Sequence, residues 1–242
     1  MGSAVVRQLE SLLRTRHLDS TLAKAWLDAP SPAVATTGQI SLDRALGGGW
    51  RRGEISELVG ARSSGRTSLL VTTLSAATDR GDIVGLVDAC DCFDPAGAAA
   101  CGLDLSRVLW IRGPSVTAEF CGRPLIETVV RRAIRAFDLL LRAGGFGIAV
   151  LDVADVPARW LRSVPMTTWL RMAHANEGRD TVGLMLGEAP MGRSARGATV
   201  RVQATSRWTG SDIRQRCLSG LDVRVNVASA TRLADHELQL TL

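Results

Sequence analysis

The sequence contains no tyrosine and only one lysine, Lys24, among its 242 residues. All its other Lys-or-Arg positions are arginine, a compositional bias that a lysine required by phosphate chemistry should have resisted. Long apolar runs are also absent, because charge or glycine interrupts each one well before the ~18 residues of a membrane helix. The N-terminus lacks the basic and apolar regions of a signal peptide. We therefore expect a cytoplasmic protein that does not enter a membrane.

Cysteine is scarce and unpaired in its spacing. The five cysteines form an odd number without a C-x-x-C pair, which predicts reduced thiols rather than a disulfide framework or a metal site. The six tryptophans are scattered, a pattern that favours core packing over base stacking. The cysteines are Cys90, Cys92, Cys101, Cys121 and Cys217.

Composition is ordinary for a chain with one sizeable core, at 46% hydrophobic and 22% charged residues. The net charge of +5 suits a polyanionic partner, but the excess is dispersed and suits a solvated basic surface equally well.

The chain divides into a helical prefix and an α/β segment. In VVRQLESLLRTRHL, residues 5–18, five apolar side chains fall at helical spacing: Val5, Val6, Leu9, Leu12 and Leu13. The prolines of DAPSPA, residues 28–33, then break the pattern. We assign residues 1–34 to an N-terminal helical segment with its linker, and residues 35–242 to the core.

Strand and helix patterns alternate through the core. Buried strands are expected at 54–60, 83–89, 108–113, 147–152 and 181–187, and helices at 67–81 and 123–145. The second helix has an apolar stripe formed by Ile126, Val129, Val130, Ala133, Phe137 and Leu140. Alternating strands follow at 199–206, 221–229 and 236–242. The order predicts an α/β fold with a mainly parallel central sheet, flanking helices and antiparallel C-terminal strands.

The stretch VGARSSGRTS, residues 59–68, carries the clearest chemical signal. Gly60 and Gly65 have the spacing of a phosphate-binding loop, G-x-x-x-x-G-K-[ST], between a strand and a helix. Thr67, followed by Ser68, stands where a hydroxyl would ligate magnesium, and Asp152 ends a strand where a second magnesium contact usually lies. The lysine position holds Arg66. Guanidinium is planar and wider than ammonium, so we expect a loop impaired for hydrolysis.

Two stretches, 36–69 and 86–113, resemble the ATPase core of the bacterial RecA recombinases. TTGQISLDRALGGG, SSGRT and DACDCFDP are similar to that family's first conserved segment, its phosphate loop and the end of its second strand. The resemblance spans about residues 35–242, is faint after residue 113, and implies a RecA-type fold without a counterpart of the RecA C-terminal domain.

The same resemblance implies that the chemistry is altered. Cys90 takes the place of the glutamate that activates water, and its neighbour Asp91 should point to the opposite side. Glu188, after Gly187, takes the place of a glutamine that senses the γ-phosphate. The resemblance therefore implies a non-catalytic core without a resident cofactor, with weak binding of ATP and magnesium left open.

The segments 153–165 and 189–199 match the recombinase DNA-binding loops and are shorter. They carry Arg159, Arg162, Arg193 and Arg196, which would contact phosphates or simply be solvated. Weak or no binding of single-stranded DNA is expected.

The chain is a short RecA-like sequence with altered nucleotide motifs, and in these respects it resembles the ImuA family of damage-induced mutagenesis. That likeness implies an adaptor in translesion synthesis whose partners are RecA and a Y-family polymerase-like protein of the ImuB type. The N-terminal stripe, with Val5, Leu9, Leu12 and Leu13, would dock on such a partner or pack on its own core. A DNA-dependent ATPase and a SulA-like inhibitor of the division GTPase are the alternatives.

Overall fold

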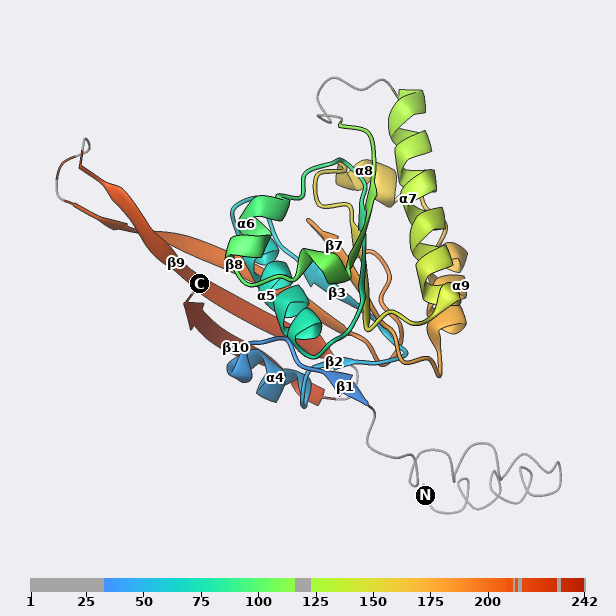
Figure 1. Cartoon of the computed structure of the whole chain (residues 1–242), viewed down its shortest axis with the longest axis horizontal. Coiled ribbons are helices and arrows are strands. Elements are labelled where there is room, and N and C mark those ends of the chain that lie inside the picture. The colour runs from blue at the N-terminus through green and yellow to red at the C-terminus, as the bar shows by residue number, and fades with distance from the viewer. Residues whose placement is uncertain (1–32, 116–122, 211, 213–214, 230–231, 242) are drawn as a thin grey trace, which may run out of the picture. The chain divides into compact units, whose positions relative to one another are not determined.

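The computed structural model describes residues 33–115, 123–210, 212, 215–229 and 232–241 (Figure 1). The N-terminal stripe with Val5, Leu9, Leu12 and Leu13 lies outside the described residues, as does Cys121. The residues from Val34 onward form one compact unit.

Helices and strands are interspersed along this unit as far as Gly187, and three consecutive strands follow. The helices are α4 (Ile40–Leu46), α5 (Arg66–Asp79), α6 (Pro95–Ala100), a 3-10 turn (Leu105–Arg107), α7 (Arg123–Ala143), α8 (Ala158–Leu161) and α9 (Met166–Asn176). The strands are β1 (Val34–Ala35), β2 (Trp50–Arg51), β3 (Ile55–Val59), β4 (Val84–Asp88), β5 (Val108–Arg112), β6 (Ile148–Asp152), β7 (Val182–Gly187), β8 (Ala198–Thr209), β9 (Cys217–Ser229) and β10 (Arg232–Thr241).

The main sheet has eight strands in the order β10-β9-β8-β3-β7-β6-β4-β5. Every pairing from β8 to β5 is parallel, whereas β9 pairs antiparallel with both β8 and β10. The predicted α/β fold with antiparallel C-terminal strands is confirmed. β1 and β2 form a separate two-stranded ribbon.

The central parallel strands β3, β4, β6 and β7 are buried on both faces because helices cover each side of the sheet, whereas the edge strand β5 is partly exposed. Successive strand residues alternate between two clusters: Leu86 packs with α5, whereas Val87 packs with α7. The same alternation occurs at Val150 and Leu151. In Figure 1, α5 lies against one side of the sheet, while α7 and α9 run along the other. The six apolar residues predicted on one stripe of α7 are all buried.

Strands β8 and β9 continue beyond this core. The burial pattern of β8 alternates to Ala204 and then becomes exposed to Thr209, where Figure 1 shows β8 and β9 projecting as a ribbon. Trp50 and Trp169 are core residues as expected, but Trp208 on this ribbon is 51% exposed.

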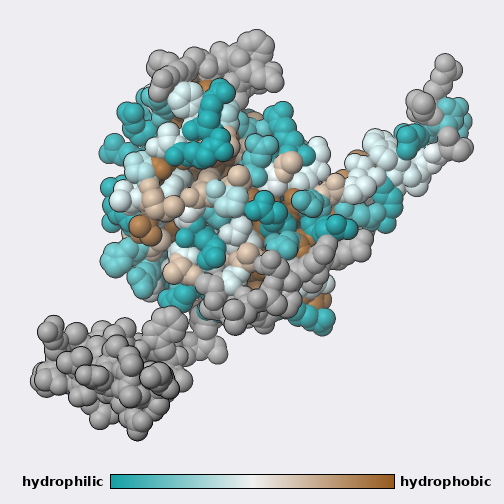
Figure 2. All heavy atoms as spheres, turned by 180° about the vertical axis from the view of Figure 1, so that it is seen from behind, coloured by the Kyte–Doolittle hydropathy of each residue, from teal (hydrophilic) through white to brown (hydrophobic). Residues whose placement is uncertain are grey.

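Polar residues predominate on the face of the described residues that Figure 2 shows, with apolar residues in small, scattered groups. None of the described helices combines the length and apolarity needed to cross a bilayer.

Two buried carboxylates, Glu54 just before β3 and Glu57 within it, hold the loop that follows β7. Glu57 is 1% exposed and accepts hydrogen bonds from the backbone N–H groups of Met191 (2.6 Å) and Gly192 (2.7 Å). It also accepts one from the Thr199 hydroxyl (2.7 Å). Glu54 accepts from the Ser194 hydroxyl and pairs with Arg196 at 2.7 Å. Because buried charge must be compensated, both carboxylates fix the path of residues 189–199.

This arrangement predicts a large and local effect of Glu57→Ala. The substitution leaves two N–H groups without their acceptor, so the free energy of unfolding should fall by about 2–4 kcal/mol in urea denaturation. Trypsin should also cut faster at Arg193 and Arg196. The matched control is Glu188→Ala, at an exposed carboxylate in the same region, which should change stability by less than about 0.5 kcal/mol. Equal effects of the two substitutions would contradict the pinning role.

Candidate functional site

The glycine loop joins the end of β3 to the start of α5, as its sequence spacing predicts. Gly65 has a φ of 85° and precedes the first residue of α5. Gly60 has no room for a side chain, because an added Cβ would lie 2.4 Å from the Ser64 hydroxyl and 2.6 Å from the Val202 carbonyl oxygen. Both glycines therefore serve the curled backbone that phosphate loops require.

Arg66 turns into this loop rather than out to solvent. It is 5% exposed, and its guanidinium donates hydrogen bonds to the Gly60 carbonyl and, at 3.4 Å, to the Ala154 carbonyl. One side chain thus links the first glycine of the loop to the turn after β6. Thr67 and Ser68 begin α5 and are exposed. They line, with Gly65 and Arg66, a depression of about 440 Å³.

Three carboxylates gather beside the loop. Asp88 and Asp152 end the neighbouring strands β4 and β6 and stand in register with each other. Asp88 accepts hydrogen bonds from the N–H groups of Cys92 (3.0 Å) and Phe93 (2.9 Å). Burial raises the pKa of Asp152 to about 7, with further upward contributions from Asp88 and Asp155, while the Ala154 N–H and Arg66 act in the opposite direction.

Cys90 follows β4 at the position where the resemblance requires a water-activating glutamate. The thiol is buried, and this burial, with nearby Cys92, Asp155, Asp152 and Asp88, raises its pKa to about 12. Cys92 is exposed, but partial desolvation and the nearby carboxylates Asp155 and Asp88 raise the pKa of its thiol to about 11. Both thiols are free, and at neutral pH both are protonated. Neither can accept a proton from water.

Asp91 is directed away from the loop, as expected. Its backbone has a positive φ of 58°, and its carboxylate forms a two-bond ion pair with Arg112 at the end of β5, at 2.8 and 2.9 Å. The Arg112 hydrogen bond lowers the pKa of Asp91. The carboxylate is thus held ionised against an arginine on the far side of β4.

The sequence reasoning did not anticipate the ion pair between Arg62 and Asp155. Arg62 lies within the glycine loop and donates two hydrogen bonds, at 3.0 and 2.7 Å, to one oxygen of Asp155. Asp155 follows β6 by three residues and lines the same depression as Thr67. Only the tertiary pairing brings these two charges together, and no spacing in the sequence signals it. The buried glutamates of EISELV did carry a signal, since charge within an otherwise apolar strand requires partners.

The remaining predicted residues lie in the segments that follow β6 and β7. Glu188 follows β7 and is exposed. Arg159 and Arg162 are exposed at α8, where the Arg159 guanidinium lies 5.6 Å from the centre of the Trp160 ring. Arg193 donates to the carbonyls of Ser194, Ala195 and Gly197, whereas Arg196 pairs with Glu54. The structure therefore engages Arg193 and Arg196 internally and leaves Arg159 and Arg162 at the surface.

The raised pKa of Asp152 predicts a pH-dependent stability. The carboxyl group of Asp152 has an ordinary pKa of 3.8 in the unfolded chain and a pKa of about 7 in the native protein. Between these two pH values the native state therefore binds a proton that the unfolded state releases. The free energy of unfolding should consequently fall as pH rises through this window. Asp152→Asn keeps an acceptor for Ala154 and removes the charge, so the variant should exceed the wild type by about 2–4 kcal/mol at pH 8.

The difference should vanish near pH 4, as followed by urea denaturation at several pH values. Asp91→Asn provides a control of opposite sign: its lowered pKa gives stability that is present at neutral pH and lost in acid. Parallel pH profiles for the wild type and Asp152→Asn would contradict the assignment.

Comparison with known proteins agrees with this geometry. Residues 27–153 match the RecA N-terminal domain family. The chain is 34% identical over 127 residues to Protein RecA of Parasynechococcus marenigrum (strain WH8102), a region covering 52% of this chain and 30% of that protein. It is 37% identical over 120 residues to Protein RecA of Sinorhizobium fredii (strain NBRC 101917 / NGR234), covering 49% of this chain and 29% of that protein.

The chain therefore aligns with less than a third of the length of these relatives. The matched region contains the glycine loop, Cys90 and Asp152, and covers more than half of the chain. The chain belongs to the RecA N-terminal domain family.

Proposed function

We propose that this protein is a non-catalytic, RecA-like adaptor of a translesion DNA synthesis assembly in the DNA damage (SOS) response, similar to the ImuA family. Its partners in this proposal are RecA and a Y-family polymerase-like protein of the ImuB type. The core would act as a scaffold for protein contacts rather than as a motor.

The position of Arg66 carries the proposal. Its guanidinium donates to the Gly60 and Ala154 carbonyls, so the loop closes on its own side chain. A nucleotide phosphate would need the N–H groups of that loop and a cation aimed outward. The residues present do not fit a tightly held nucleoside triphosphate, because binding would require the buried arginine to leave its two acceptors.

The surroundings of Cys90 support the same reading. The RecA resemblance assigns activation of the attacking water to the residue at position 90, and position 91 is the neighbour that could replace it. The Cys90 thiol has its pKa raised to about 12 and is protonated at neutral pH, and Asp91 is held by Arg112.

The loops that match the recombinase DNA-binding segments support an adaptor with little affinity for DNA. Arg196 is paired with Glu54, and Arg193 is bound to three carbonyls of its own loop. Arginines engaged in this way have fewer donors for phosphates.

A DNA-dependent ATPase is the second candidate, and one observation favours it. Thr67 and Ser68 remain exposed at the start of α5, within a depression beside Asp155. A nucleotide that displaced Arg66 would find these hydroxyls available. Measurement of phosphate release separates the two candidates.

We expect negligible ATP turnover, with and without single-stranded DNA. Arg66→Lys alone should not restore it, because lysine returns the phosphate contact but not the base at position 90. Phosphate release from purified protein should match that of an Asp152→Ala control in every condition. DNA-stimulated turnover above this control would overturn the non-catalytic role.

We also expect weak binding of single-stranded DNA that fades between low and physiological salt. Fluorescence anisotropy with a labelled oligothymidylate should give similar affinities for the wild type and for Arg193→Gln/Arg196→Gln. Arg159→Gln/Arg162→Gln, which removes exposed charges, should weaken the residual binding at low salt. Tight binding at physiological salt that depends on Arg193 and Arg196 would instead place a DNA site on residues 189–199.

A further inference from the structure

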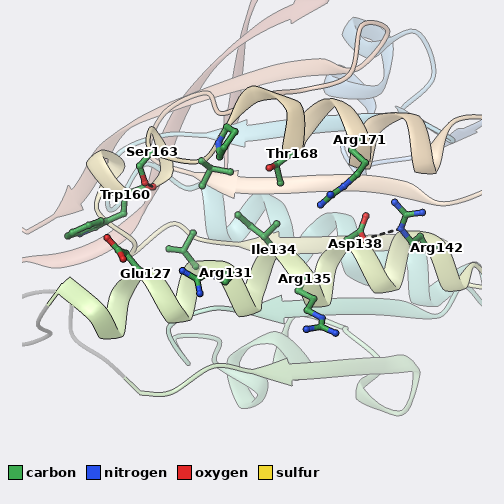
Figure 3. Close-up of a pocket in the computed structure, with 13 residues that line it drawn as sticks. Glu127, Arg131, Ile134, Arg135, Asp138, Arg142, Trp160, Ser163, Thr168 and Arg171 are labelled. Carbon is green, nitrogen blue, oxygen red and sulfur yellow. Dashed lines mark hydrogen bonds and ion pairs between the residues drawn. The ribbon is translucent and has the colours of Figure 1, made fainter.

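A groove separates α7 from the α8–α9 segment, on the face of the sheet opposite α5 (Figure 3). Its volume is about 680 Å³, and it lies apart from the glycine loop. The α7 residues that line it run from Glu127 to Arg142, a helical length of about 22 Å. In Figure 3, Ile134 lies between the two helices, and Arg171 reaches from α9 toward α7.

The groove combines an apolar floor with a basic rim. Val130, Ile134, Trp160, Val164 and Pro165 supply apolar surface. Four arginines and two carboxylates are polar members of the lining, which gives it an excess of positive charge. Large side chains with apolar character at the bottom of a concave surface are typical of protein contact sites.

Three of the arginines have no carboxylate partner in the part of the chain that the structure describes: Arg131, Arg135 and Arg171. Only Arg142 is neutralised, through Asp138 at 2.9 Å. All three free arginines are exposed. Arg131 and Arg135 are also one helical turn apart, so their guanidinium groups present a row of donors along the groove.

From this charge pattern we infer that the groove binds an acidic, amphipathic helix of a protein partner. The apolar face of that helix covers Ile134 and its neighbours, while its carboxylates meet Arg131, Arg135 and Arg171. Helix-in-groove contacts of this kind use apolar anchors one turn apart, and charge-assisted arginine–carboxylate bonds add orientation.

The lining favours a peptide over a nucleic acid. Single strands bind to successive aromatic platforms along a basic track. This groove has one aromatic side chain, Trp160, and its other apolar lining residues are aliphatic or proline. It therefore offers only one platform on which a base could stack. The chain's own N-terminal stripe is a poor occupant, because Arg7, Arg14 and Arg16 accompany it against Glu10 alone and would be repelled by the rim.

This inference deepens the proposed adaptor role and depends on it for the expectation of a protein partner. The two remain separable, because phosphate release tests the non-catalytic core and peptide binding tests the groove. A peptide result against the groove would leave the ATP result unaffected.

The test uses the whole 242-residue chain and fluorescein-labelled peptides of about 14 residues, with binding measured by anisotropy at physiological salt. The first peptide places leucines at helical i, i+3, i+4 and i+7 spacing and glutamates on the adjoining positions. The second replaces the glutamates by lysine, and the third replaces the leucines by serine. An oligothymidylate of similar length is the fourth probe.

We expect the acidic, leucine-bearing peptide to bind at least about tenfold more tightly than each of the other probes. Arg131→Ala/Arg135→Ala should weaken its binding by about tenfold or more. The matched control, Arg132→Ala/Arg201→Ala, removes the same charge from exposed sites that do not line the groove, and should bind like the wild type.

Three results would overturn the inference. Equal losses in the two double variants would mean attraction to net charge rather than to this groove. Equal binding of the serine peptide would remove the role of the apolar floor. Preferential binding of the oligothymidylate, sensitive to Arg131 and Arg135, would make the groove a nucleic-acid site.

Discussion

Pairing of β3 on both sides is the constraint on which the rest of the structure depends. This strand joins β7 on one edge and β8 on the other, so it links the parallel strands to the antiparallel ribbon. All five of its residues are buried. Because the strand cannot shift without breaking both ladders, its end places the glycine loop, and Glu57 within it fixes the segment after β7.

The glycine loop has the curled backbone of a phosphate loop, and the Arg66 side chain lies within it. Gly60 and Gly65 preserve the backbone curl, and α5 still begins at the next residue. Arg66 uses that curl as its own binding site by donating to two carbonyls. The ion pair of Arg62 with Asp155 adds a second connection between the same loop and the turn after β6. The guanidinium groups of Arg66 and Arg62 thus hold the loop through carbonyl and carboxylate contacts, at a place where the family resemblance predicts contacts with phosphate.

Two surfaces on opposite faces of the sheet have different characters. The edge beside α5 gathers Asp88, Asp152 and Asp155, and burial of Asp152 raises its pKa to about 7. The groove between α7 and α9 instead gathers arginines around aliphatic side chains. The proposed adaptor role assigns scaffolding to the first surface and partner contact to the second. The two surfaces share no lining residue, so substitutions in the glycine loop need not disturb the groove.

The sequence by itself determined the architecture, because burial writes its period directly into the chain. The five predicted core strands lie within one residue of their expected bounds at every end, and the six stripe residues of α7 from Ile126 to Leu140 are buried. Gly60, Gly65 and Asp152 were identifiable as well, since spacing and strand ends locate them. The tertiary structure alone decided the partners of the charged side chains around the glycine loop and in the segment after β7. Arg66 binds the Gly60 carbonyl, 6 positions away in the sequence. Arg62 pairs with Asp155 across 93 positions, and Arg196 pairs with Glu54 across 142. The groove likewise depends on α7 packing beside α9. Such contacts follow from distance in space rather than from local periodicity, so a single sequence carries no direct record of them.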